Sequence, residues 1–212
     1  MNRSSTLPFA AVLFAHSFAQ YSFAQPALDW KPIFDGKSLD GWRATQSPGK
    51  WTARGGTIRG EGTAGQLVYM VSKCVNCELK ADVRINHGGN AGISLRAPAG
   101  ANVETGYETP VNSTSTVNPV RTGGLYAGIK ILKPMQEQLI PDDTWFQVRI
   151  SAVGNRIQVF INGKPTADVI DEANTYAAGN IAFQKYDRGA LVEFKNVMMR
   201  DLATPRSPVT GR

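Results

Sequence analysis

Histidine and cysteine are scarce in this sequence, and their scarcity excludes several kinds of catalytic site. Two of the 212 residues are histidines and two are cysteines, so a zinc centre with several histidine ligands is excluded. A Ser-His-Asp triad would have to use His87, and the Gly-x-Ser-x-Gly turn that presents a serine nucleophile is missing. The Gly-x-x-x-x-Gly-Lys-Ser/Thr loop that cradles phosphates is also missing. Carboxylate, arginine, lysine and tyrosine side chains remain as groups that could carry chemistry.

Clusters of basic residues are missing as well. The chain has a formal net charge of +6, but its lysines and arginines are scattered and never form a run of four. Proteins that bind nucleic acids usually present a basic stripe with interleaved aromatic residues. We therefore expect no nucleic-acid partner.

The sequence has no apolar run long enough to span a bilayer, and its clearest apolar stretch lies near the N-terminus. Residues 1–24 contain the parts of a signal peptide: a positive start, an apolar core over 7–15 and small residues before a cleavage position at 22–24. Residues 17–19 offer an earlier cleavage position. An apolar core of this length is too short for a membrane-spanning helix. We therefore expect a protein without a membrane span that is periplasmic or secreted after removal of residues 1–24.

The two cysteines, Cys74 and Cys77, form a Cys-x-x-Cys pair. Such a pair can be a redox dithiol, half of a zinc site or a small disulfide loop. The second half of a zinc site is missing, and Cys77 leads into an alternating strand pattern, whereas redox motifs of the thioredoxin type open a helix. Because export permits disulfides, we expect either a local disulfide or two packed thiols.

Short strands closed by turns account for the chain over residues 28–202. Apolar residues alternate without fault over 78–85, which is typical of an antiparallel strand with one buried face. Glycine-containing turns at 154–155 and 162–163 predict tight hairpins, and a change of phase near Asn196 predicts a bulge. No sustained helical period is present, so we expect a single all-β domain of two packed sheets or a barrel.

Two further segments read as irregular structure. Residues 203–212 combine two prolines with small polar residues and predict a flexible tail. Residues 112–124 are rich in serine, threonine and asparagine, which predicts a long surface loop. Loops of this length often carry function or are disordered.

The residues from 87 to 96 combine backbone freedom with charge, because three glycines are followed by apolar positions that alternate with Ser94 and Arg96. This alternation predicts a strand with Ser94 and Arg96 on one face. Glu108 follows Tyr107 after a short loop and could lie on the adjoining strand, facing the same surface. An arginine, a carboxylate and an aromatic ring on one surface suit a sugar. An ordinary cross-strand Arg-Glu pair would give the same pattern.

Several motifs occur in the order and spacing of one known family. They are Phe34-Asp35-Gly36-Lys37-Ser38-Leu39-Asp40-Gly41-Trp42, Cys77-Glu78-Leu79, Gly89-Asn90-Ala91-Gly92-Ile93 with Arg96, Gly106-Tyr107-Glu108, Gly124-Leu125-Tyr126, Asn162-Gly163 and Val192-Glu193-Phe194-Lys195-Asn196-Val197. Over about residues 33–202 the sequence resembles the 3-keto-disaccharide hydrolase family, common among exported bacterial proteins. The resemblance implies an all-β fold, a two-sheet antiparallel jelly-roll sandwich of the concanavalin A or laminin G type.

The resemblance also implies an activity, the cleavage of glycosides whose C3 hydroxyl has been oxidised to a ketone. The ketone acidifies the proton on C2, so a carboxylate base can remove it and expel the C1 substituent. Water then adds to the resulting enone. An upstream sugar 3-oxidoreductase would supply such a substrate. No cofactor is evident, although a divalent cation held by oxygen ligands is compatible with this chemistry.

The family match assigns roles to individual residues. Glu108 would be the base, and Arg96, with Lys130 as the weaker candidate, would stabilise the enolate oxygen. Tyr186 stands where the family has a histidine and would replace it as an acid, close to Gln184, which matches the family. The residues expected to bind and orient the sugar are Asn90, Tyr107, Tyr126, Lys130 and Gln184.

A non-catalytic carbohydrate-binding module, similar to a lectin, is the alternative, because jelly rolls also bind glycans on aromatic platforms that need no base. The aromatic residues available for such a platform are Trp42, Trp51, Tyr107 and Tyr126. Pro110 stands where the family has a glutamine, which is compatible with a changed substrate or with binding alone. A closed pocket around Glu108 would favour the enzyme, whereas a flat aromatic groove would favour the binding module.

Overall fold

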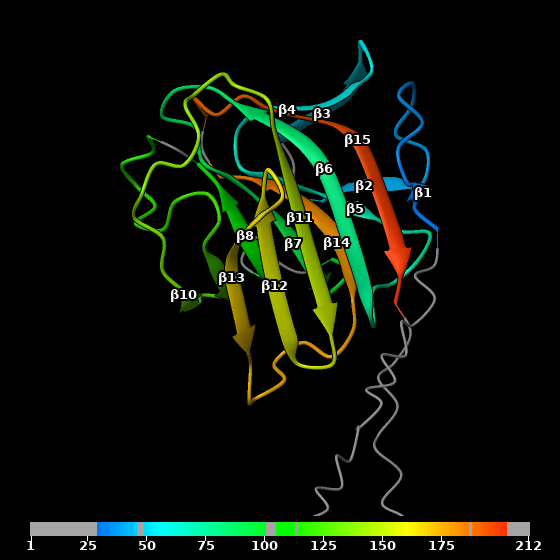
Figure 1. The fold of residues 1–212 in the computed structure, drawn as a ribbon. Helices are drawn as coiled ribbons and strands as arrows, with labels where there is room; N and C mark the ends of the chain where they lie inside the picture. Colours follow the sequence, from blue (N-terminus) through cyan, green and yellow to red (C-terminus); the bar gives the residue numbers. More distant parts are fainter. Residues whose placement is uncertain (1–28, 46–48, 101–104, 113, 187, 203–212) are drawn as a thin grey trace, which may run out of the picture.

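The computed structural model describes residues 29–45, 49–100, 105–112, 114–186 and 188–202 (Figure 1). The expected signal peptide, residues 1–24, and the expected flexible tail, residues 203–212, lie outside the described residues. Within the described part, the chain forms strands and turns without a helix. That part accordingly contains no helix with the length and apolar character needed to cross a membrane.

The first sheet has eight antiparallel strands and forms the front layer in Figure 1. From one edge to the other, its strands are β13 (Lys164–Ile170), β12 (Arg156–Ile161), β11 (Phe146–Val153), β6 (Cys77–Ile85), β15 (Val192–Asp201), β4 (Thr57–Gly62) and β3 (Gly49–Arg54). The short strand β1 (Lys31–Pro32) also pairs with β15.

The second sheet has seven antiparallel strands and lies behind the first in Figure 1. Its order is β10 (Lys130–Lys133), β9 (Leu125–Ala127), β8 (Tyr107–Val111), β7 (Ala91–Ala97), β14 (Asn180–Lys185), β5 (Gly65–Tyr69) and β2 (Trp42–Thr45). Two antiparallel sheets packed face to face confirm the predicted all-β jelly-roll sandwich.

The core lies between the sheets and is centred on stacked aromatic rings. Phe183 of β14 stacks on Phe194 of β15 with ring centroids 4.0 Å apart, which joins the middles of the two sheets. Trp42 stacks on Phe183 at 5.0 Å, and its indole N–H donates to the carbonyl oxygen of Ile33 at 2.7 Å. Trp51 packs against Phe194 at 6.4 Å. Both tryptophans are therefore core residues and not parts of an exposed aromatic platform.

The predicted turns and bulge are present in the first sheet. Gly154 has φ of 55° between β11 and β12, and Asn162 and Gly163 have φ of 49° and 77° between β12 and β13. Positive φ values at these positions suit two-residue hairpin turns. Asn196 has φ of 51°, and the register of β15 with β6 shifts there. The sequence signals for these local features are therefore confirmed.

Cys74 and Cys77 are joined by a disulfide, which confirms one of the two expected forms. Both side chains are fully buried. The backbone N–H of Cys74 donates to the carbonyl oxygen of Gly179 at 2.7 Å, and the N–H of Gly179 donates back at 3.1 Å. The small loop thus fastens the start of β6 to the segment before β14. A buried disulfide in this position suits a structural bridge.

Candidate functional site

Glu108 lies on the outer face of the second sheet, the face turned away from the first sheet. Because successive side chains of a strand alternate, the core positions of Ile93 and Tyr107 place Gly92, Ser94 and Glu108 on this outer face. Ser94 is directly opposite Glu108 in the pairing of β7 with β8. Glu108 is only 4% exposed and extends across Gly92, where a Cβ would lie 2.1 Å from Oε1. The missing side chain of Gly92 therefore makes room for the carboxylate.

Tyr186 holds the carboxylate of Glu108 in place. Its hydroxyl donates to Oε2 of Glu108 at 2.8 Å, and its backbone N–H donates to the carbonyl oxygen of Asn90 at 2.9 Å. A phenol and a carboxylate in this contact can pass a proton between them. The two side chains that the sequence assigned as base and acid are therefore in direct contact.

A chain of hydrogen bonds continues from Asn90 to Tyr126. Nδ2 of Asn118 donates to Oδ1 of Asn90 at 3.3 Å, and the hydroxyl of Tyr126 donates to Oδ1 of Asn118 at 2.9 Å. Tyr126 is opposite Glu108 in the pairing of β8 with β9. Burial, together with the negative charge of Glu108, raises the pKa of the Tyr126 phenol. The phenol therefore stays protonated and can act as a hydrogen-bond donor.

These side chains line a pocket of about 350 Å³. Its lining residues are Asn90, Glu108, Val117, Asn118, Pro119, Tyr126, Gly128, Ile129 and Tyr186. Polar groups converge around Glu108, whereas Val117 and Ile129 are 71% and 79% exposed and form an apolar rim. A few convergent polar groups within an otherwise apolar hollow are typical of small-molecule sites. We therefore take this hollow, the Glu108 pocket, as the candidate functional site.

A row of polar side chains without partners continues across the same face. Gln66 is opposite Gln184, Gln184 is opposite Gly92, and Ser94 is opposite Glu108. The amide groups of both glutamines and the hydroxyl of Ser94 are buried and have no hydrogen-bond partner among the described residues. Because buried polar groups are nearly always hydrogen-bonded, this row is suited to buried water molecules.

Arg96 does not line the Glu108 pocket, contrary to the expectation that it shares a surface with Glu108. The register of β7 with β14 shifts at this point and Arg96 has φ of 57°, so it is the extra residue of a β-bulge. Its guanidinium donates to the carbonyl oxygens of Gly154 at 2.8 Å, Tyr176 at 2.9 Å and Val75. The bulge breaks the alternation that the sequence predicted, and Arg96 ties three loops together instead.

Tyr107 belongs to the core, contrary to the expectation that its ring contacts a sugar beside Glu108. Neighbouring residues of a strand point to opposite faces, so Tyr107 points away from Glu108. The Tyr107 hydroxyl donates to Oδ2 of Asp171 at 2.8 Å, and its ring packs edge-on against Tyr176 at 5.5 Å. Burial, together with the hydrogen bond to Asp171, raises the pKa of Tyr107 to about 12.

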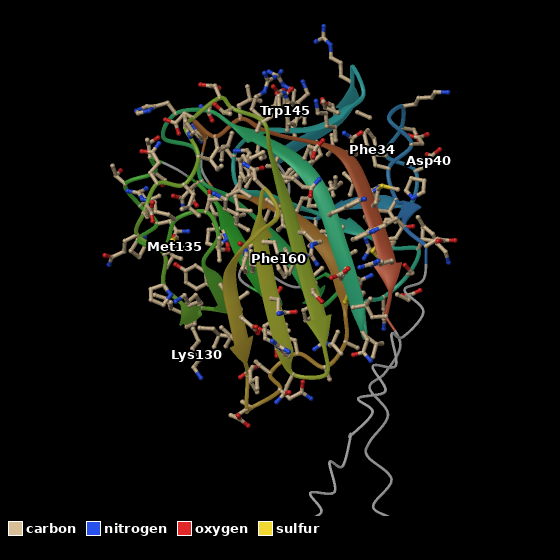
Figure 2. All side chains as sticks on the ribbon, viewed as in Figure 1. Phe34, Asp40, Lys130, Met135, Trp145 and Phe160 are labelled. Atoms are coloured by element: carbon tan, nitrogen blue, oxygen red, sulfur yellow. A yellow bond between two sulfur atoms is a disulfide. The ribbon has the colours of Figure 1, made fainter. Side chains whose placement is uncertain are left out.

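The other expected sugar-binding residues have three different positions. Asn90 and Tyr126 line the Glu108 pocket. Gln184 lies in the row of buried, unpaired polar groups. Lys130 begins β10 with an exposed side chain, directly after the lining residue Ile129, but does not itself line the pocket (Figure 2). The structure therefore brings Asn90 and Tyr126 to Glu108 and leaves Lys130 outside.

Sequence reasoning missed Asn118, which lies in the segment that was expected to be a surface loop. Over 114–124 this segment is folded back on β8, since the Asn112 side chain donates to the carbonyl oxygen of Val120 at 2.7 Å. The segment thereby carries Asn118 to Asn90 and Tyr126. The available signal was Asn118-Pro119, a turn-forming pair inside a polar run.

The Glu108 pocket has few oxygen ligands for a metal ion. Its lining offers one carboxylate, Glu108, and the side-chain oxygens of Asn90 and Asn118. Calcium and magnesium are usually held by several carboxylate and carbonyl oxygens. Across the described ranges, no three His, Cys, Asp or Glu side chains gather in a way that could hold a metal. This donor set does not fit a dedicated divalent-cation site.

Gly92→Ala tests whether the position of the Glu108 carboxylate matters. The new Cβ would lie 2.1 Å from Oε1 and 2.7 Å from Cδ of Glu108, so the carboxylate must move. The displaced carboxylate is buried and bound by Tyr186, so we also measure the urea midpoint and express activity per folded molecule. If Glu108 acts as the expected base, displacing its carboxylate by about 1 Å should lower activity about 10²-fold. Unchanged activity at an unchanged midpoint would show that the carboxylate need not lie across Gly92.

The chain matches the 3-keto-alpha-glucoside-1,2-lyase-like domain over residues 29–200. A stretch of 73 residues is 38% identical to a 3-keto-disaccharide hydrolase of Bacteroides thetaiotaomicron. This local match covers 29% of the present chain and 25% of that protein.

Solved structures share the fold at low sequence identity. A Parabacteroides distasonis protein, provisionally described as a glycosyl hydrolase, is 21% identical with a TM-score of 0.64, over 82% of this chain and 94% of that chain. A carbohydrate-binding module of Bacillus subtilis is 15% identical with a TM-score of 0.59, over 76% of this chain and 96% of that chain. Because the domain match spans residues 29–200, this chain belongs to the family of 3-keto-alpha-glucoside-1,2-lyase-like domains, as its resemblance to 3-keto-disaccharide hydrolases predicted.

Proposed function

We propose that this protein cleaves 3-keto-glycosides, with Glu108 as the base that removes the proton from C2. The observation that carries the proposal is the contact inside the Glu108 pocket, where a buried carboxylate is held at 2.8 Å by the hydroxyl of Tyr186. The family to which the chain belongs supports the substrate class.

The first step is an elimination across C1 and C2. The C3 ketone makes the C2 proton acidic, and the Glu108 carboxylate accepts it. The electron pair of the C2–H bond forms the C1=C2 double bond, and the bond from C1 to the leaving oxygen breaks. That oxygen takes the hydroxyl proton of Tyr186, which Glu108 replaces through the 2.8 Å hydrogen bond between them. The products of this step are the released alcohol and an enone.

The second step is the addition of water to the enone. The water oxygen bonds to C1, Glu108 accepts a proton from it, and C2 then takes that proton from Glu108. Glu108 ends as a carboxylate and Tyr186 as a phenol, so both groups are ready for another cycle. The sum is one 3-keto-glycoside and one water converted to one 3-keto-sugar and one alcohol.

The negative charge that develops on the ketone oxygen needs hydrogen-bond donors inside the pocket. Arg96 lies outside the lining, whereas the phenol of Tyr126 and the amides of Asn90 and Asn118 lie within it. Donors fixed in a water-poor site stabilise a developing oxyanion strongly.

A non-catalytic carbohydrate-binding role is the second candidate, and the fold shared with a carbohydrate-binding module favours it. That role would rest on an exposed aromatic platform. Trp42, Trp51 and Tyr107 are buried in the core, however. Of the four aromatic residues expected to form the platform, Tyr126 alone lines the pocket. The carboxylate–phenol pair therefore makes catalysis the stronger candidate.

The expected location and partner extend the proposal. The signal peptide pattern of residues 1–24 would place the reaction in the periplasm or outside the cell. A C3 ketone does not occur in ordinary glycosides, so a sugar 3-oxidoreductase must act before this protein.

The test is aglycone release from aryl 3-keto-glucosides and from their unoxidised parents, carried out in D₂O. We expect aglycone release from the keto compounds alone. We also expect deuterium at C2 of the product, because the proton that Glu108 passes to C2 comes from a solvent water. Free 3-keto-glucose incubated without protein measures background exchange. EDTA should not abolish the release, since the pocket lacks a dedicated cation site.

Two results would contradict this mechanism. Release from the unoxidised parents at a comparable rate would remove the need for the ketone. A product without C2 deuterium above background would exclude elimination. Binding of a keto-glucoside without any release would instead support the carbohydrate-binding role.

A further inference from the structure

A second hollow lies on the first sheet, and four of its eight lining residues are cations. Its volume is about 380 Å³. The charged and aromatic residues that line it are Arg54, Arg59, Arg84, Lys195, Glu193 and Trp145. Four cations and one carboxylate give this basic pocket a formal charge of +3. An excess of one sign in a hollow concentrates ligands of the opposite sign.

The one carboxylate of the basic pocket is already satisfied by two arginines. Glu193 of β15 is opposite Arg84 of β6 on one side and opposite Arg59 of β4 on the other. Nε of Arg84 donates to Oε2 of Glu193 at 2.9 Å, and Nη1 of Arg59 is 3.8 Å from Oε1. The Arg84 and Arg59 side chains are still 39% and 37% exposed. Nε of Arg59 also donates to Oε2 of Glu61 at 3.2 Å, and the N–H groups left on the two arginines are accessible to a ligand.

Lys195 and Arg54 add charge that no carboxylate balances. Neither side chain takes part in a salt bridge within the described ranges. Nζ of Lys195 lies 4.2 Å from the ring centroid of Trp145, and Cζ of Arg84 lies 5.0 Å from it. Cations at this distance are attracted to the face of an indole. Trp145 therefore gathers two of the cations at the basic pocket.

The basic pocket is separate from the Glu108 pocket. Its residues come from β3, β4, β6 and β15 of the first sheet and from Trp145 just before β11. Glu108 and Tyr126 belong to the second sheet. Figure 2 shows Trp145 at the upper end of the sandwich and Lys130, next to the rim of the Glu108 pocket, at the lower left. A ligand in one pocket therefore leaves the other open.

We propose that the basic pocket binds an anionic sugar unit, a carboxylated or sulfated residue of a polysaccharide chain. The anionic group accepts hydrogen bonds from Lys195 and Arg54 and from the accessible N–H groups of Arg59 and Arg84. Trp145 keeps Lys195 and Arg84 beside each other at the hollow. The protein is thereby held on an anionic glycan, and the Glu108 pocket on the other sheet stays accessible to a small keto-sugar.

The compact form of the basic pocket favours a polysaccharide over a nucleic acid. Proteins that bind duplexes neutralise several phosphates along a basic stripe. Here the unbalanced cations converge on one hollow of about 380 Å³ instead of following an extended line. One anionic group beside one ring fits that arrangement.

The test measures binding of the protein to sodium polygalacturonate and to heparin by isothermal titration calorimetry, at low and at physiological ionic strength. Duplex DNA and neutral dextran are the comparison polymers. Lys195→Gln/Arg54→Gln should weaken binding to the preferred anionic polysaccharide about tenfold, because two charge-assisted contacts are lost. Lys37→Gln/Lys164→Gln removes the same charge from exposed positions outside the pocket and should bind like the unchanged protein.

Tighter binding of polygalacturonate would identify the anionic group as a carboxylate, and tighter binding of heparin would identify it as a sulfate. In either case the preference should disappear in Lys195→Gln/Arg54→Gln and remain in Lys37→Gln/Lys164→Gln. An equal loss in both double variants would overturn the proposal, because net charge alone would then explain the binding. It would also be overturned by DNA binding as tight as that of the polysaccharides, or by no binding to either one. Binding that weakens with ionic strength and spares dextran is the expected result.

Discussion

Replacing Glu108 by glutamine should lower kcat for an aryl 3-keto-glucoside at least about 10³-fold, with little change in KM. The substitution keeps the size of the side chain and its place across Gly92. The amide oxygen can still accept the hydrogen bond from Tyr186. An amide cannot take a proton from C2, however, so the elimination loses its base. Release of the phenol, followed spectroscopically, gives both constants.

Tyr186→Phe is the matched companion variant, because it keeps the carboxylate and removes only its hydrogen-bond donor. We expect a smaller loss, about 10- to 10²-fold in kcat, since the leaving oxygen must then take its proton from water or from Glu108 directly. Retention of more than about a tenth of kcat in Glu108→Gln would show that another group is the base. A rise in KM with an unchanged kcat would assign Glu108 to substrate binding.

The parts of the site that sequence predicted correctly rest on short-range signals. Alternation in β7 and β8 predicts that Ser94 and Glu108 share one face, and the pairing of the two strands sets them opposite each other. The family position of Tyr186 implies an acid at the site, and the structure brings its hydroxyl to Glu108 from one residue beyond the end of β14. Where a strand is regular, the alternation of its side chains is therefore enough to predict which face of the sheet each residue occupies.

The same parity shows why Tyr107 was misplaced. Tyr107 and Glu108 are consecutive in β8, so an extended strand must send their side chains to opposite faces. The motif Gly-Tyr-Glu suggests that the ring and the carboxylate bind one ligand together. Alternation along a strand separates two adjacent side chains, so the motif and the strand geometry make opposite predictions. The ring is instead a core element that reaches Asp171.

Features that depend on long-range register could not be predicted. The bulge in β7 arises from its pairing with β14, which is far away in the sequence, so alternation over Ser94 to Ala97 gives no sign of it. The row of unpaired amides requires β5, β14 and β7 to be neighbours. Asn118 reaches the pocket only because its loop folds back on Asn112.

Arg96→Met should destabilise the fold by about 3–4 kcal/mol, and turnover per folded molecule should remain close to that of the unchanged protein. The Arg96 guanidinium is nearly inaccessible and donates to carbonyl oxygens of three separate loops, at Gly154, Tyr176 and Val75. Burial lowers the pKa of this guanidinium. Methionine fills much of the same volume but donates no hydrogen bond, so three carbonyl oxygens lose a charged donor at once.

Urea unfolding followed by tryptophan fluorescence measures the loss, and Arg156→Met is the control for it. Arg156 also makes strong contacts, donating from Nε and Nη2 to Asp168 at 2.7 and 2.6 Å, but both side chains are exposed. An exposed pair contributes little to stability, so this control should lose far less stability than Arg96→Met. If Arg96→Met were as stable as the unchanged protein but had lost kcat, Arg96 would act on the substrate, as the family resemblance implied. Reduced stability with an unchanged kcat would show that Arg96 serves to hold the three loops together.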